Sequence, residues 1–220
     1  FKGYLHADGY KAYNSVPEIT IVGCWAHARR CFVDALKAMP PKKDDKLTAT
    51  EEGLKFCNKL FEIERELHDV TPQERYEGRI TKSKPVVDKF KKWLQHQRPR
   101  VLPRSPLGSA IQYCLNQWEK LTAFLLDGRL ELDNNRGERS IKPFVIGRKN
   151  WLFSNTPKGA ASSATIYSIV ETAKENGLNP FEYLKYLFDK LPNSDITDIN
   201  TLDEFMPWST TLPQVCRVKS

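Results

Sequence analysis

The residues of this sequence that could carry out chemistry gather around one carboxylate, Glu138. It lies in the segment LDNNRGERSIKPFVIGRKNWLF, which covers residues 132–153. The nearby side chains are mostly cationic: Arg136, Arg139, Lys142, Arg148 and Lys149. A carboxylate can bind a hard metal ion, and cations around it can contact phosphate groups. The segment is therefore a candidate metal-binding carboxylate within a phosphate-binding surface. The alternative is a surface helix with a salt-bridged Glu, which is the commoner role of such a residue.

The residues just before Glu138 predict that it lies in the first turns of a helix. Asp133, Asn134 or Asn135 can accept hydrogen bonds from the free N–H groups at a helix start. An acidic side chain in the first turn also interacts favourably with the helix dipole.

A second candidate carboxylate, Asp8, follows a predicted strand. Tyr4, Leu5 and Ala7 suit a short strand, and Gly9 would end it. Asp8 would then lie at the carboxyl edge of a sheet, where side chains converge on ligands. The alternative is an ordinary turn Asp before Gly, which this stretch by itself favours.

Cys24 and His27 have the spacing of half a zinc site, which normally needs four ligands. No second pair with comparable spacing exists in the sequence. A small buried Cys and a His that packs at a helix start are therefore the favoured interpretation. Arg29 and Arg30 follow this pair and could reach a phosphate backbone or lie in solvent.

Short strands and helices must position these residues. Residues 19–23 predict a second strand, and residues 26–39 have the apolar spacing of a helix. A polar break at residues 40–46 is the clearest boundary in the chain. The sequence is then helical to about Gly128, with cap signals at Thr48, Thr71-Pro72 and Ser105-Pro106.

Two more helices are predicted towards the C-terminus. The first begins near Lys158 and ends at Asn176-Gly177, and the second begins at Asn179-Pro180. The tail from Pro192 is polar and is expected to wrap the surface or to be partly disordered. Its isolated apolar anchors are Leu202, Phe205, Met206-Pro207-Trp208 and Leu212-Pro213.

Composition limits the classes of protein to consider. The chain has 220 residues, 40% hydrophobic and 28% charged, with a net charge of +7. A modest basic excess is compatible with a nucleic-acid partner without requiring one. Five Cys without a paired pattern favour a reducing compartment.

No apolar run approaches the roughly 20 residues that span a bilayer, so we expect no membrane partner and a cytoplasmic location. Because the chain begins with Phe1 directly before a predicted strand, we expect it to be a fragment of a longer protein.

Several motifs, in this order, resemble one family. They are HADGY at 6–10, GCWAHARR at 23–30, SPLG at 105–108, NQW at 116–118, LDNNRGER at 132–139, PFVIGRKNWLFS at 143–154 and MPW at 206–208. Together they closely resemble the C-terminal catalytic segment and the C-terminal element of bacterial transposases of the insertion sequence 66 family. The resemblance runs almost from end to end.

The resemblance implies an acidic-triad (DDE) transposase with a ribonuclease-H-like fold. By motif, Asp8 matches the second Asp of the triad and Glu138 the Glu, and they are 130 residues apart. The first Asp would lie upstream of Phe1. The predicted fold class is α/β and predominantly helical, a partial ribonuclease-H-like core with an inserted all-α subdomain. The predicted domains are core residues 1–40, a helical insertion at 41–128, the rest of the core with the Glu helix at 129–192, and a C-terminal element at 193–220.

The family chemistry implies two Mg²⁺ (or Mn²⁺) ions about 3.5–4 Å apart. Water would attack a phosphodiester at the transposon end, and the freed 3′-hydroxyl would attack target DNA. The implied metal ligands are Asp8 and Glu138, and the implied DNA contacts are Arg29, Arg30, Arg136, Arg139, Lys142, Arg148 and Lys149. With two of three carboxylates, the chain alone is expected to be inactive. The expected partners are DNA, the missing N-terminal part of the transposase and a second copy in a homodimer.

Two other functions remain open from the sequence. One is a non-catalytic DNA-binding or oligomerising remnant of a transposase with vestigial carboxylates. The other is a small structural zinc protein built on Cys24 and His27. A longer parent with an Asp-bearing strand would favour the enzyme, and zinc analysis would test the last alternative.

Overall fold

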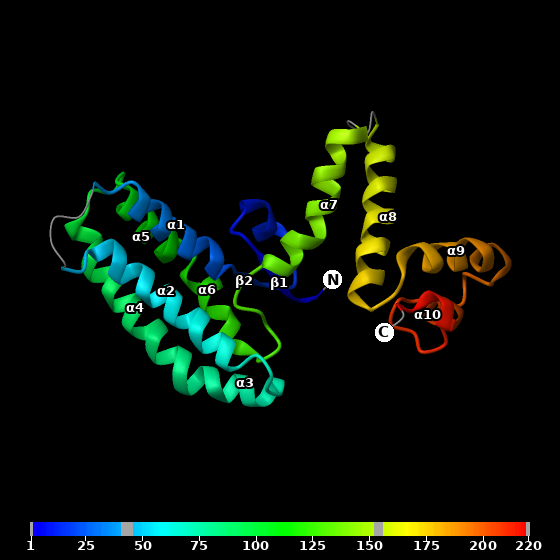
Figure 1. Ribbon diagram of the computed structural model, residues 1–220, viewed down its shortest axis with the longest axis horizontal. Helices are drawn as coiled ribbons and strands as arrows, with labels where there is room; N and C mark the ends of the chain where they lie inside the picture. Colours follow the sequence, from blue (N-terminus) through cyan, green and yellow to red (C-terminus); the bar gives the residue numbers. More distant parts are fainter. Residues whose placement is uncertain (1, 41–45, 152–155, 219–220) are drawn as a thin grey trace. The chain divides into compact units, whose positions relative to one another are not determined.

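A computed structural model describes residues 2–40, 46–151 and 156–218, except for the side chains of residues 11 and 148–151. The described residues are predominantly helical and include one two-stranded sheet. They fall into two compact units, Phe1–Glu138 and Arg139–Ser220 (Figure 1). The elements of the first unit are β1 (Gly3–Ala7), β2 (Ile19–Gly23), α1 (Trp25–Lys37), α2 (Ala49–Glu66), α3 (Pro72–Gly78), α4 (Lys84–Gln97), α5 (Pro106–Asn116) and α6 (Trp118–Thr122). Helix α7 (Asn135–Trp151) begins in this unit.

The two strands pair in parallel, which gives them a common carboxyl edge. Ala7 of β1 pairs with Gly23 of β2. Asp8 and Cys24 are the next residues of the two strands, so both leave the sheet at this edge. Both strands predicted from the sequence are confirmed, whereas a complete ribonuclease-H-like sheet remains a prediction.

Four helices of the first unit pack around a single hydrophobic core. Helix α1 contacts α2 and α5, and α4 contacts the same two helices (Figure 1). The core contains Trp25 and Phe32 from α1, Phe90 from α4 and Val22 from β2, all fully buried. The Trp25 indole N–H donates to the carbonyl of Leu121 at 2.7 Å. The helices between Asp8 and Glu138 therefore share their core with the strand that leads to Cys24.

The cap signals in the sequence are confirmed. Thr48 and Thr71 each form a capping box with the Glu three residues later. The Ser105 hydroxyl accepts from the backbone N–H of Gly108. These side chains satisfy N–H groups that a helix start otherwise leaves without partners.

A buried arginine, Arg79, fixes the loop that leads towards α7. It lies in a short π-helical segment, Arg79–Ser83, and its side chain is fully buried. Its guanidinium forms a two-point ion pair with Glu64, at 2.8 and 2.6 Å. It also donates to the carbonyls of Phe124, Asp127 and Leu130. The loop is thus tied to α2 and to the π-helical segment by one side chain.

The second unit contains the rest of α7, α8 (Pro157–Glu175), α9 (Pro180–Lys190) and α10 (Ile199–Glu204). Helix α8 ends before Gly177, whose φ of +69° is left-handed and suits glycine. Two of the apolar anchors predicted in the tail, Phe205 and Leu212, are buried. Together with Cys216 they pack with Tyr183 and Leu187 of α9. These apolar side chains are spaced irregularly, so no periodic pattern marked them as core.

None of the helices in the described part of the chain has the length and apolar character needed to span a membrane. The division into four domains at residues 40, 128 and 192 remains a prediction.

Candidate functional site

The start of α7 is held against the start of α1 by two hydrogen bonds. The backbone N–H of Trp25 donates to the carbonyl of Leu132 at 3.2 Å, and that of Asn134 donates to Cys24 Sγ at 3.3 Å. Residues 132–134 therefore lie beside the residues that leave β2. This arrangement brings the first turn of α7 to the carboxyl edge of the sheet.

Glu138 lies in the first turn of α7, as predicted. Its backbone N–H donates to the carbonyl of Asn134 at 3.0 Å. Among the candidate cap residues, Asp133 accepts from the N–H of Asn135 at 2.9 Å. A Cβ at Gly137 would lie 2.8 Å from Asn134 Oδ1, so a residue without a side chain suits this turn.

The side chains nearest to Glu138 form a mixed group of three ligand types. His27 Nδ1 lies 3.6 Å from Glu138 Oε1. Cys24 Sγ completes the group, and the three ligand atoms lie within 4.8 Å of one another. His27 Nδ1 and Glu138 Oε1 are both buried and accept or donate no hydrogen bond. Burial raises the pKa of the Cys24 thiol, and the N–H of Asn134 acts in the opposite direction. From their spacing, Cys24 and His27 could form half a zinc site, although a buried Cys and a packed His were the favoured interpretation, and the structure places Glu138 beside both.

Asp8 is exposed just beyond β1. Its Oδ1 accepts from the backbone N–H of Tyr10 at 3.1 Å, which is the turn predicted as the alternative role. The Tyr113 hydroxyl donates to the backbone carbonyl of Asp8 at 3.3 Å. Asp8 leaves the same sheet edge as Cys24, which lies beside Glu138. A shared metal site for Asp8 and Glu138 remains a prediction.

Two polar residues near this edge had no predicted role. His6 Nδ1 and Gln117 Oε1 are buried without a hydrogen-bond partner. Burial lowers the pKa of His6, partly offset by Glu131 and Asp133. The side chain of Gln117 faces Gly9, where an added Cβ would lie 3.3 Å from Gln117 Cδ. Both residues belong to the HADGY and NQW motifs, which were the available signal.

A polar groove of about 810 Å³ runs between α1 and α2. Its cationic lining residues are Arg29, Arg30, Lys37 and Arg65, against the carboxylates of Asp34 and Glu62. The Arg29 Nε–H donates to Asn58 Oδ1 at 2.7 Å, so this arginine is already oriented. Asn135, in the first turn of α7, also lines the groove. The groove is therefore cationic and adjoins the turn that carries Glu138.

The other candidate phosphate contacts lie along α7. Arg136, in the first unit, and Arg139 and Lys142, in the second, are all exposed. Arg148 and Lys149 were also predicted to contact DNA, and their side chains lie outside the described residues.

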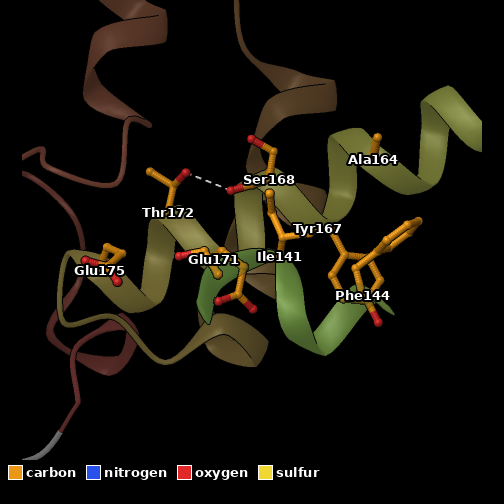
Figure 2. Close-up of a pocket in the computed structure, with 9 residues that line it drawn as sticks. Ile141, Phe144, Ala164, Tyr167, Ser168, Glu171, Thr172 and Glu175 are labelled. Atoms are coloured by element: carbon orange, nitrogen blue, oxygen red, sulfur yellow. Dashed lines mark hydrogen bonds between the residues drawn. The ribbon is translucent and has the colours of Figure 1, made fainter. Parts of the chain in front are cut away.

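A separate apolar groove of about 440 Å³ lies within the second unit, between α7 and α8. Figure 2 shows Ile141 and Phe144 of α7 facing residues of α8. The rings of Phe144 and Tyr167 meet edge to face, with centroids 5.0 Å apart. This groove shares no residue with the Cys24, His27 and Glu138 group.

The site residues fall inside a known family pattern. The family model described as "Transposase IS66 family" matches residues 1–162, which include Asp8, Cys24, His27 and Glu138. The chain belongs to the IS66 transposase family. A second model, "IS66 C-terminal element", matches residues 168–208. DDE transposases, the class of the IS66 family, generally use divalent metal ions.

Two curated relatives come from Sinorhizobium fredii and are described as uncharacterized proteins. The protein y4jD is 34% identical, covering 98% of this chain and 42% of the relative. The protein y4hP is 30% identical, covering 94% of this chain and 40% of the relative. The chain therefore spans about two fifths of the length of these relatives. No solved structure matches it.

Proposed function

We propose that this chain is part of a DNA transposase and that Asp8 and Glu138 are metal ligands of its phosphoryl-transfer site. The observation that carries the proposal is the position of Glu138. The first turn of α7 is hydrogen-bonded to the residues that leave β2, and Asp8 leaves the paired strand at the same edge. The residue that follows β1 and the start of α7 therefore both lie near the carboxyl edge of the sheet, which supports a shared role for the two carboxylates.

The donor atoms at this edge fit a divalent cation. Glu138 Oε1 is buried and has no hydrogen-bond donor, so a cation would satisfy it. Asp8 is exposed, and one of its carboxylate oxygens accepts from Tyr10. Carboxylate oxygens suit Mg²⁺ or Mn²⁺. When bound, a pair of such ions would activate the attacking oxygen and stabilise the leaving oxygen of a phosphodiester.

The cationic groove supports the DNA part of the proposal. Arg29 and Arg30 line it, and Asn135 connects it to the turn that carries Glu138. Arginines on one groove can hold phosphate groups without reading base sequence. Their role would be to place a phosphodiester beside the two carboxylates.

The test combines DNA binding with cleavage. The purified chain is expected to bind double-stranded DNA, with an affinity that falls steeply as salt is added. Because the 220 residues supply two of the three family carboxylates, we expect no Mg²⁺-dependent cleavage of transposon-end DNA by this chain. Cleavage that disappears in Glu138→Gln would refute the proposed inactivity. Affinity that stays flat between low and moderate salt would refute the groove as a DNA surface.

The same measurements distinguish the enzyme fragment from a non-catalytic remnant. If the chain is an enzyme fragment, the parent chain should bind Mn²⁺, and Glu138→Gln should bind it with lower affinity. For a remnant with vestigial carboxylates, DNA binding would persist while Mn²⁺ affinity would be the same in both proteins.

A further inference from the structure

We propose that Cys24, His27 and Glu138 bind one zinc-class ion, with the fourth coordination position open. The three residues come from the start of α1 and the start of α7. Their ligand atoms are the single cluster of three or more potential metal ligands in the described part of the chain. The proposal does not depend on transposase activity.

The spacing of the atoms is close to that of a tetrahedral site. Zinc lies about 2.3 Å from sulfur and about 2.0–2.2 Å from nitrogen or oxygen, which places neighbouring ligand atoms roughly 3.4–3.6 Å apart. His27 Nδ1 and Glu138 Oε1 are 3.6 Å apart. All three ligand atoms lie within 4.8 Å of one another. Small rotations of the side chains would complete the geometry.

Two of these atoms have no other partner. His27 Nδ1 and Glu138 Oε1 are both buried without a hydrogen bond. A buried polar atom without a partner is unfavourable, and one bound cation would satisfy both atoms. The Glu138 side chain as a whole is 42% exposed, so an ion and a water or an anion could reach the open position from solvent.

The combination of ligands selects the kind of metal. Thiolate and imidazole suit Zn²⁺ and similar ions, whereas Mg²⁺ prefers oxygen ligands and retains its waters. Zinc binds cysteine as the thiolate, so the Cys24 thiol would give up its proton when the ion binds. The N–H of Asn134 already points at Cys24 Sγ and would stabilise the thiolate.

Glu138 would then serve two metals. If the proposed function holds, zinc occupying Glu138 would compete with Mg²⁺ for this carboxylate. This consequence rests on the proposed function, while the zinc site stands on the geometry of the three ligand atoms.

The experiment is a titration of the metal-free chain with Zn²⁺, and in parallel with Co²⁺ as a spectroscopic substitute. We expect one ion per chain, a thiolate-to-cobalt absorption band, and no displacement of zinc by excess Mg²⁺. Cys24→Ser should abolish the band, and His27→Ala and Glu138→Gln should weaken zinc binding by roughly tenfold or more. Cys31→Ser is the matched control, since Cys31 lies on the same helix outside the ligand group, and it should retain both band and affinity.

Two results would overturn the proposal. One is a cobalt band that persists in Cys24→Ser, and the other is a zinc affinity within twofold of the parent chain in Glu138→Gln. Circular dichroism shows whether each variant folds. If Cys24→Ser does not fold, the zinc affinity of Glu138→Gln provides the test. Failure here leaves Mn²⁺ binding by Asp8 and Glu138 to be measured separately, so the two proposals fail independently.

Discussion

At the scale of single residues, the roles of Arg29 and Arg30 can be separated from general charge. Both are exposed on α1 and line the polar groove. Each arginine that neutralises a phosphate contributes about −0.9 to the slope of log affinity against log salt. The double variant Arg29→Ala, Arg30→Ala should bind DNA more weakly and reduce the magnitude of the slope by roughly 1 for each arginine that binds a phosphate.

The matched control for this double variant removes two positive charges elsewhere in the same unit. Lys89 and Lys92 are exposed on α4 and do not line the groove. Lys89→Ala, Lys92→Ala should change the slope far less. Fluorescence anisotropy over a range of salt concentrations measures both slopes, and equal slopes in the two double variants would exclude the groove as a phosphate-binding surface.

Residue types and spacing explain which site residues were predictable. Glu138 and its helix start follow from local signals, the cap residues and the charges around it. The proximity of Cys24 and His27 to Glu138 does not, because more than 100 positions separate them in sequence and only tertiary packing brings them together. Local sequence patterns do not reveal this long-range packing, so the proximity of the three residues could not be predicted from them.

At the scale of elements, Arg79 is the side chain that fixes the path to α7. It is fully buried, forms an ion pair with Glu64 and donates to the carbonyls of Phe124, Asp127 and Leu130. Replacing it with Ala would remove the ion-pair partner of Glu64 and one hydrogen-bond donor from each of those carbonyls. Removing one member of a buried ion pair typically costs about 3–5 kcal/mol, so we expect a loss of that size in the free energy of unfolding of Arg79→Ala.

The control for Arg79 is an exposed ion pair on the same segment. Lys82 bonds to Glu66 at 2.8 Å, with both side chains about half exposed. Such pairs contribute about 0–1 kcal/mol, so Lys82→Ala should change stability little. Urea denaturation compares the two variants, and similar losses in both would contradict the role assigned to Arg79.

Helices and strands were more predictable than this buried network. The caps at Thr48, Thr71 and Ser105 work through side chains within three residues, so their sequence signals suffice. Arg79 gave no such signal, because an arginine within a helical stretch normally faces solvent. Its burial depends on Glu64 and on backbone carbonyls more than 40 residues away.

At the scale of the whole molecule, each compact unit has its own hydrophobic core. In the second unit, the Tyr183 hydroxyl donates to the carbonyl of Phe205 at 2.7 Å, which ties α9 to the tail. Loss of one such bond costs about 1 kcal/mol. Tyr183→Phe should destabilise the second unit by about that amount, as thermal unfolding can measure.

Tyr183 also predicts a dependence on alkaline pH. Burial raises its pKa from 10.0 to about 12. The unfolded chain therefore loses this proton before the folded chain does, so the stability from this group falls as pH rises from about 10 towards about 12. Tyr183→Phe should lack this contribution, and the stability difference between the two proteins should shrink across that interval. A constant difference would contradict the assignment.

The tail shows the limit of sequence patterns at this scale. Phe205, Leu212 and Cys216 are buried, although the surrounding residues are polar and irregularly spaced. The family resemblance, in contrast, runs almost from end to end and is confirmed by two family models over residues 1–162 and 168–208. The two-stranded, predominantly helical fold is also confirmed, while the wider ribonuclease-H-like core remains a prediction.

The central claim is that Asp8 and Glu138 hold a metal ion together, and a mutant cycle of Mn²⁺ affinity tests it most directly. Electron paramagnetic resonance would measure free Mn²⁺ with the parent chain, Asp8→Asn, Glu138→Gln and the double variant, with Glu119→Gln on α6 as an exposed control. We predict that each single variant binds Mn²⁺ roughly tenfold or more weakly, and that the double variant is weakened by less than the sum of the two effects, since the residues share one site. An unchanged affinity in Asp8→Asn, or purely additive losses, would contradict a shared site.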